Sequence, residues 1–275
     1  MKPAPFLYAR ARTVDEALAL LAEHGDDAKP LAGGQSLVPL LNMRLARPSA
    51  LVDVNRVEGL DRIAIDDGAV RVGAIVRQSA LESWPEVRAS LPLVAEALPY
   101  VGHFATRNRG TVGGSIAHAD ASAELPLCLA CLQGSVVVAG PAGRREVAAD
   151  DFFLTHFTTS LEPGELLVET VWPSARPNDG FAFEEFALRH GDYALAMVAC
   201  VVRDGRARVT LGAVVDRPTS LDLPLDPHEA GEAAAASVDP PASIHATPEY
   251  RRRLVATLVG RAVGRAARNA QEGAR

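Results

Sequence analysis

The sequence predicts an α+β protein in which a short region of parallel strands and helices precedes a larger region with antiparallel strands. Up to residue 57, short apolar strands alternate with helical patterns, as in parallel β/α units. From residue 58 onwards, glycine-containing turns separate pairs of strands, as in hairpins. After residue 176, three longer apolar strands with short connections predict an antiparallel sheet that is followed by helices.

The first region begins with a capped helix. Thr13 is followed three residues later by a glutamate, which is the pattern of a capping box, and Gly25 ends the apolar helical spacing. A short strand at 29–32 leads to two glycines. Ser36 is expected to cap a second short helix, and residues 50–54 form another buried strand. This region predicts a small parallel subdomain over residues 1–57.

The second region mixes helices with hairpins over residues 58–176. Asp-Asp-Gly and Gly-Pro-Ala-Gly supply the turn residues of two hairpins. The predicted elements are a hairpin at 62–66 and 69–72, helices at 79–84 and 91–98, a second hairpin at 135–139 and 144–147, and a strand at 166–172.

The last region, residues 177–275, predicts a three-stranded antiparallel sheet and helices. Its expected strands are 180–187, 194–202 and 207–215, and its expected helices are 230–236 and 250–267. The run Arg251–Arg253 is expected to be a solvated helix face.

Composition excludes several classes of protein. The formal net charge of −6 over 275 residues argues against a non-specific nucleic-acid binder. No apolar run is long enough to cross a bilayer, and the N-terminal residues lack a signal-peptide pattern, so we expect a cytoplasmic protein without a membrane anchor. Cys128, Cys131 and Cys200 are too few for a disulfide framework or an iron–sulfur cluster, which usually needs four thiolates, so we expect buried thiols.

Two glycine clusters stand out. The first is LAGGQS at 31–36 and the second is RGTVGGS at 109–115. Neither is the G-x-G-x-x-G pattern or the P-loop pattern, so an ordinary Rossmann site or a nucleoside triphosphatase site is excluded. Each cluster alone can be a tight turn without a ligand. Two such bends that face each other would present backbone N–H groups to an anion such as a diphosphate, and Ser36, Thr111 and Ser115 would add hydroxyl groups.

Longer stretches around these clusters resemble one protein family. AGGQS, MRLARPSALVDVNRV, RNRGTVGGSIAHADASAELP and RHGDYALA occur in the order found in the flavin-binding medium subunits of carbon monoxide dehydrogenase-type molybdenum hydroxylases. These subunits are related to the flavin domain of xanthine dehydrogenase. The resemblance implies a fold with two FAD-binding subdomains and a C-terminal sheet-plus-helix domain, with FAD held non-covalently in a cleft between the subdomains.

The resemblance also implies the cofactor-binding residues. Two loops correspond to those that hold the pyrophosphate, a third group lines the ribityl, ribose or adenine portions, and an aromatic residue lies near the isoalloxazine ring. These residues are, in turn, Ala32, Gly33, Gly34, Gln35, Ser36 and Leu37; Thr111, Gly113, Gly114 and Ser115; His118, Asp120 and Glu124; and Tyr193.

Simpler interpretations and departures remain open at several positions. His118 can be an ordinary loop histidine, Asp120 and Glu124 can serve only to stabilise a helix start, and Tyr193 can be a packing residue of the sheet. Gln35 stands where the family often has histidine. Leu188 and Glu185 stand where it commonly has basic residues, so no cationic contact with the flavin or an electron acceptor is expected from those two positions.

The leading functional hypothesis is an electron-transfer subunit. The resemblance implies a large partner subunit with a molybdenum cofactor and a small partner subunit with two [2Fe–2S] clusters, assembled as a dimer of heterotrimers. FAD in this chain would pass electrons to an external acceptor. No catalytic residue is assigned, because flavin carries the redox chemistry. The alternatives are a self-sufficient flavin-dependent oxidoreductase and a non-enzymatic ligand-binding or scaffold domain.

Overall fold

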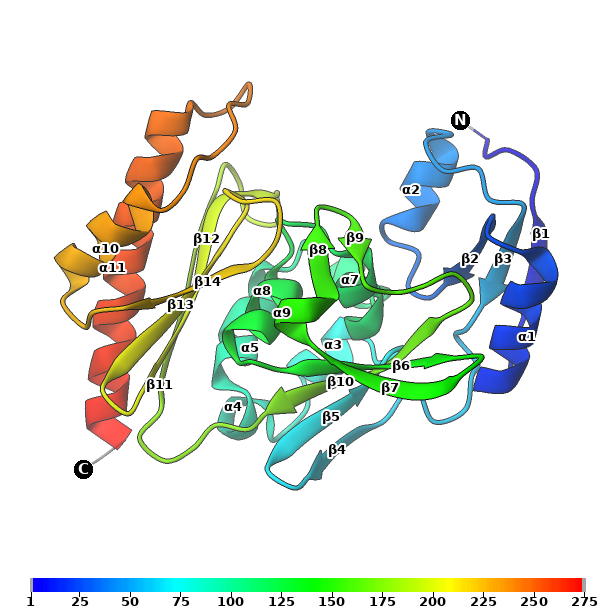
Figure 1. The fold of residues 1–275 in the computed structure, drawn as a ribbon, viewed down its shortest axis with the longest axis horizontal. Coiled ribbons are helices and arrows are strands. Elements are labelled where there is room, and N and C mark those ends of the chain that lie inside the picture. Colours follow the sequence, from blue (N-terminus) through cyan, green and yellow to red (C-terminus); the bar gives the residue numbers. More distant parts are fainter. Residues whose placement is uncertain (1, 274–275) are drawn as a thin grey trace.

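Three groups of buried apolar residues follow one another along the longest axis of the computed structural model, which describes residues 2–273 (Figure 1). The N-terminal part lies at one end, the middle of the chain lies at the centre, and the C-terminal helices lie at the other end (Figure 1). The predicted α+β character is confirmed, with one parallel and several antiparallel sheets.

The N-terminal part is a three-stranded parallel sheet in the order β1-β3-β2. Its elements are β1 (Leu7–Arg10), α1 (Val14–His24), β2 (Ala28–Leu31), α2 (Leu37–Asn42) and β3 (Ala50–Asp53). The Thr13 hydroxyl accepts a hydrogen bond from the Glu16 N–H at 3.1 Å, which confirms the predicted cap. Two details differ: β1 was not predicted, and Ser36 precedes α2 without a capping hydrogen bond.

The middle part is built on a five-stranded antiparallel sheet in the order β4-β5-β10-β6-β7. Its strands are β4 (Ile63–Asp66), β5 (Ala69–Gly73), β6 (Ser135–Gly140), β7 (Gly143–Ala148) and β10 (Leu166–Pro173). Both predicted hairpins are confirmed, and Asp67 and Gly68 supply positive φ angles of 46° and 74° at the first turn.

Helices cover one face of this sheet, and the core of the N-terminal part packs against the other. The remaining elements of the middle part are α3 (Gln78–Glu82), α4 (Val87–Ser90), α5 (Pro92–Ala97), η1 (Leu98–Tyr100), α6 (Phe104–Arg107), α7 (Val112–His118), α8 (Glu124–Cys131), α9 (Ala149–Phe152), β8 (Phe153–Thr155) and β9 (Thr158–Thr159). The entirely buried α8 carries Cys128 and Cys131, and these two thiols and that of Cys200 are buried as predicted.

The C-terminal part is a four-stranded antiparallel sheet covered by two helices (Figure 1). Its elements are β11 (Gly180–Ala187), β12 (Ala194–Arg203), β13 (Arg206–Gly212), β14 (Thr219–Leu223), α10 (Pro227–Ala236) and α11 (Pro248–Gly273). The prediction of three strands was incomplete, because β14 pairs with β13 and extends the sheet. Alternate residues of β12 face the middle core and the C-terminal core, so the strand is buried on both faces.

One predicted surface residue is buried. Arg251 is only 7% exposed, and its Nη1 donates to the carbonyl oxygens of Leu195 and Ala213, each at 2.9 Å. The expectation of a solvated arginine face is therefore wrong at Arg251, because this side chain donates hydrogen bonds to backbone carbonyls in and next to the sheet.

No helix within residues 2–273 is both long and apolar enough to cross a membrane.

Candidate cofactor site

The two glycine clusters lie in direct contact. We name residues 32–37 the first bend and residues 109–115 the second bend. A Cβ atom placed on Gly33 would lie 2.5 Å from the carbonyl oxygen of Arg109 and 2.8 Å from the Cα atom of Gly110. Only glycine permits this approach, because real Cβ atoms essentially never come within 3.0 Å of such atoms. The prediction that the two distant bends come together is confirmed.

The first bend leaves a series of backbone donors without internal partners. Within the described chain, the N–H groups of Gly33, Gly34, Gln35 and Ser36 donate no hydrogen bond to the protein. Gly34 has a φ angle of +71°, which reverses the chain direction at a low cost only for glycine. Successive free N–H groups at such a turn form a binding surface for an anion.

The second bend uses its glycines differently. The Gly113 N–H donates to the carbonyl oxygen of Ala74 at 3.0 Å, and the Gly114 N–H donates to the hydroxyl of Thr111, the cap of α7, also at 3.0 Å. A Cβ atom on Gly113 would lie 2.6 Å from the Cα atom of Ala74. These glycines thus permit close packing, and the polar groups that this bend can still offer include the hydroxyls of Thr111 and Ser115.

Both bends line one cavity of about 880 Å³, and every predicted site residue lines it. Its walls come from the N-terminal part, from α7 and α8, and from the loop between β11 and β12. The volume lies within the usual range for small-molecule and cofactor sites. The predicted residues along its walls are Ala32, Gly33, Gly34, Gln35, Ser36, Leu37, Thr111, Gly113, Gly114, Ser115, His118, Asp120, Glu124 and Tyr193.

An acidic wall follows the end of α7. The pKa of Glu124 is raised to about 7, chiefly by burial and to a lesser extent by the nearby Asp120 carboxylate. Burial lowers the pKa of His118, whose ring lies on that of Phe157 with the centroids 4.7 Å apart. His156 Nε2 lies 3.5 Å from Asp120 Oδ1. This wall offers carboxyl oxygens and imidazole nitrogens to the hydroxyl or amino groups of a ligand.

The loop before β12 forms another part of the cavity wall, near Asp120 and Glu124. Gly191 has a φ angle of +82°, and a Cβ atom there would lie 2.8 Å from the His103 ring, so the loop packs tightly on its neighbour. Tyr193 follows, and its side chain is 73% exposed beside the cavity. An aromatic side chain that is not held in a core is available to pack against a planar ligand.

A family comparison identifies the cofactor that chains of this kind bind. The family model described as the FAD binding domain in molybdopterin dehydrogenase matches residues 4–175. The chain belongs to this family. It is an FAD-binding medium subunit of the molybdenum hydroxylase class, and so it is part of an oxidoreductase rather than a non-enzymatic scaffold.

Similar proteins match over nearly their whole length. The subunit alpha of the 6-hydroxypseudooxynicotine dehydrogenase complex of Paenarthrobacter nicotinovorans is 41% identical, over 98% of this chain and 97% of that protein. The carbon monoxide dehydrogenase medium chain of Hydrogenophaga pseudoflava is 35% identical, over 97% of this chain and 98% of that protein. A chain in the crystal structure of quinoline 2-oxidoreductase from Pseudomonas putida 86 superposes with a TM-score of 0.92 and 38% identity, over 98% of this chain and 99% of that chain.

The cavity has features that fit FAD. The free N–H groups of the first bend suit a diphosphate, and the glycines allow the two bends to pack closely beside it. Gln78 adds a group that the sequence did not single out. Its side chain is 4% exposed at the cavity wall, and Oε1 is buried without a hydrogen-bond partner. A buried acceptor without a donor is costly, so a ligand N–H or O–H at this position would stabilise the site.

Glu185 lies behind the cavity. It pairs with Met197 across β11 and β12, on the sheet face that packs against the middle core. Its Oε2 atom is buried without a partner, and burial, together with the Glu124 carboxylate, raises the pKa of Glu185 to about 8. At neutral pH, Glu185 is therefore a neutral carboxyl group beside the acidic wall, at a position where the family commonly has a basic residue.

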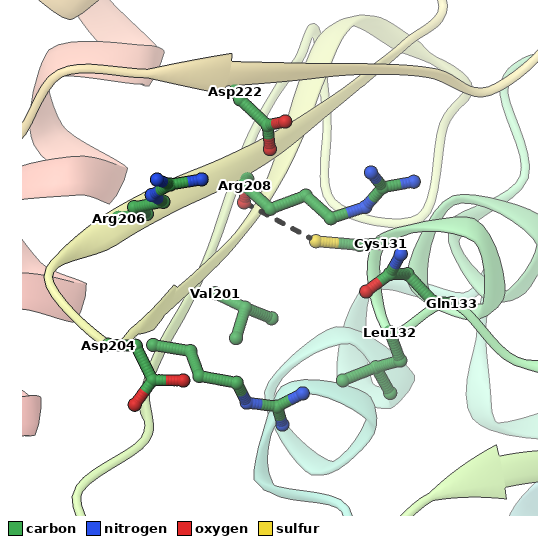
Figure 2. A pocket seen from close by; sticks show the side chains of 9 residues that line it. Cys131, Leu132, Gln133, Val201, Asp204, Arg206, Arg208 and Asp222 are labelled. Atoms are coloured by element: carbon green, nitrogen blue, oxygen red, sulfur yellow. Dashed lines mark hydrogen bonds between the residues drawn. The ribbon is translucent and has the colours of Figure 1, made fainter.

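A second hollow lies at the far end of α8 (Figure 2) and shares no lining residue with the cavity of the two bends. It has a volume of about 530 Å³ and lies against β12, β13 and β14. Three of its lining residues are arginines, but Arg203 already pairs with Asp179 and Arg208 with Asp150. None of the predicted cofactor-binding residues lines it.

Proposed function

We propose that FAD lies in the 880 Å³ cavity with its diphosphate on the first bend. The observation that carries this assignment is the run of backbone N–H groups from Gly33 to Ser36 that have no acceptor within residues 2–273. Thr111 and Ser115 line the same cavity, and their hydroxyls would donate from the second bend. In this proposal, Leu37 and Ala32 border the phosphate position, and Gly113 and Gly114 allow the start of α7 to pack closely beside it.

The two ends of FAD are assigned from the remaining walls. We propose that His118, Asp120 and Glu124 bind the ribityl, ribose or adenine hydroxyl and amino groups, because these side chains supply acceptors at one wall. The exposed ring of Tyr193 would cover one face of the isoalloxazine and exclude water from it. The same assignment leaves Gln35 beside the diphosphate, where its amide now donates to the Gly33 carbonyl at 3.2 Å.

We further propose that this chain is the exit point for electrons in a larger enzyme. A large partner subunit with a molybdenum cofactor would oxidise the substrate, and a small partner subunit with two [2Fe–2S] clusters would deliver the electrons singly. Bound FAD supplies the chemistry that collects two electrons and releases them to an external acceptor. The chain itself binds and orients the flavin and shields it from water.

The wider organisation is part of the same proposal. We place domain boundaries after residues 57 and 176, where the composition of the sequence changes. The assembly would be a dimer of heterotrimers in the cytoplasm, as the family resemblance implies. Related chains are named as a complex subunit or a medium chain, which supports the multi-subunit part of this proposal.

An absorption spectrum of the purified full chain, with and without its partner subunits, tests this proposal. The isolated chain should show flavin absorption without iron–sulfur bands, and FAD should be released on denaturation. Oxidation of an organic substrate by the chain alone would instead favour a self-sufficient flavin oxidoreductase. A chain that neither retains FAD nor gains thermal stability when FAD is added would contradict the assignment, because a bound ligand stabilises the folded state by mass action.

A further inference from the structure

We propose that Asn55 and Arg77 form a clasp that fixes the spacing of the two glycine bends, and that these two positioning residues set the affinity for FAD. The inference rests on the proposed placement of the diphosphate at the bends. Neither residue lines the cavity, so each would act through the backbone that it holds rather than by touching the cofactor.

Asn55 fixes the entrance to the first bend. It follows β3, and its Nδ2 atom donates to the carbonyl oxygens of Leu31 at 3.2 Å and Ala32 at 2.9 Å. The Asp53 carboxylate orients the amide, because its Oδ1 atom accepts from both the backbone N–H and the Nδ2 of Asn55, at 2.9 and 2.7 Å. The Leu31 carbonyl also accepts from the Val54 N–H at 3.1 Å, so Asn55 adds most at Ala32, where the first bend begins.

Arg77 connects that side chain to the second bend. Its Nη2 atom donates to Asn55 Oδ1 at 2.7 Å, and its Nη1 atom donates to the carbonyl oxygen of Arg109 at 2.5 Å. The Arg109 carbonyl is also the atom that a side chain on Gly33 would strike. One planar guanidinium thus holds the two bends at the point where they touch, and its fixed fork of donors sets the distance between them.

The charge of Arg77 suits an anion nearby. No carboxylate of residues 2–273 forms an ion pair with its guanidinium. Burial lowers the pKa of Arg77, the positive charge of Arg109 lowers it further, and Asp53 only partly opposes these effects. An anion at the bends would relieve this excess of positive charge. The clasp therefore contributes both geometry and attraction, and the two contributions are separable by experiment.

The test is a double-mutant cycle on FAD binding to the full chain. We expect Asn55→Ala and Arg77→Met each to raise the Kd for FAD by roughly tenfold to a hundredfold, the range for losing a hydrogen bond to a charged group. The double variant should lose little more than the worse single variant, because the two residues act as one unit. Arg77→Lys keeps the charge but not the fork, so it should weaken binding while it retains the salt dependence that Arg77→Met loses.

Two matched variants control for the loss of the same groups elsewhere. Asn269→Ala removes an amide that donates to the Phe181 carbonyl at 2.9 Å, and Arg71→Met removes an arginine that pairs with Glu169. Both lie outside the cavity and should leave the Kd within twofold. The melting temperature of each FAD-free variant separates a loss of folding from a loss of binding.

The outcomes distinguish the clasp from the site itself. A wild-type chain that does not bind FAD would overturn the proposed function and the clasp with it. Wild-type binding with an unchanged Kd in Asn55→Ala and Arg77→Met would overturn the clasp alone. Additive losses in the double variant, or losses no larger than those of the two control variants, would also overturn it.

Discussion

Replacing Gly33 by alanine tests the contact between the two bends. The new Cβ atom would lie 2.5 Å from the Arg109 carbonyl oxygen, whereas ordinary contacts begin at 3.4 Å, so one bend must move by about 0.9 Å. Both neighbouring atoms belong to the backbone and have no rotamer to change. Overpacking of this kind costs about 1–3 kcal/mol. If that cost falls on the FAD-bound state, the Kd for FAD rises roughly fivefold to 150-fold.

The assay is a titration of the FAD-free full chain, followed by the quenching of flavin fluorescence. Gly264→Ala is the matched control. Gly264 lies on α11, outside the cavity, and its new Cβ atom would lie at an ordinary contact distance of 3.5 Å from Pro227. The control should bind FAD as the wild type does. A Gly33→Ala chain that binds FAD within twofold of the wild-type Kd would refute the view that the contact between the bends shapes the site.

Three further substitutions test other parts of the site. Gly114→Val places a Cβ atom 2.6 Å from the Thr111 hydroxyl and should severely lower the flavin absorbance per chain; a folded variant with full flavin would contradict this role. Gln78→Leu should raise the melting temperature of the FAD-free chain, by removing an unpartnered buried oxygen, and should weaken FAD binding; stronger FAD binding would exclude Gln78 as a contact. The folded pKa of Glu185, about 8, is above its ordinary value of 4.5, so its neutral form favours folding below pH 4.5 and this contribution is lost as the pH rises to about 8. Glu185→Gln should therefore reduce the fall in unfolding free energy between pH 5 and 8 by about 2 kcal/mol, a value lowered for partial solvent access. Urea unfolding at each pH measures this free energy, and the same fall in the variant and the wild type would contradict the burial argument.

The sequence predicted which residues share one cavity wall better than it predicted the edges of the sheets. Glycine pairs are strong local signals, because few other residues permit a reversal or close approach of the backbone. β1 carried no such signal. Leu7 and Tyr8 are 62% and 51% exposed, so the strand has no buried apolar face and is defined by its pairing with β3. β14 was missed for a similar reason, since only its register with β13 identifies the mixed segment 219–223 as a strand.

The finer chemistry of the site depends on contacts between distant residues. Asn55 and Arg77 are ordinary polar residues in the sequence, and their connection exists only because β3 and the segment after β5 meet behind the bends. The internal bonding of the Gly113 amide likewise follows from its position against Ala74. A sequence pattern predicts which residues approach a ligand, but the register of the fold decides which of their hydrogen-bonding groups remain free.

Hydrogen exchange of the first bend tests the central claim most directly. The amides from Gly33 to Ser36 have no acceptor in the described protein, so they should exchange rapidly in the FAD-free full chain. Addition of FAD should protect a peptide that spans residues 31–38 strongly, while a peptide over the exposed hairpin turn at 66–69 should not change. FAD binding without protection of the first bend would contradict the claim that these amides hold the diphosphate.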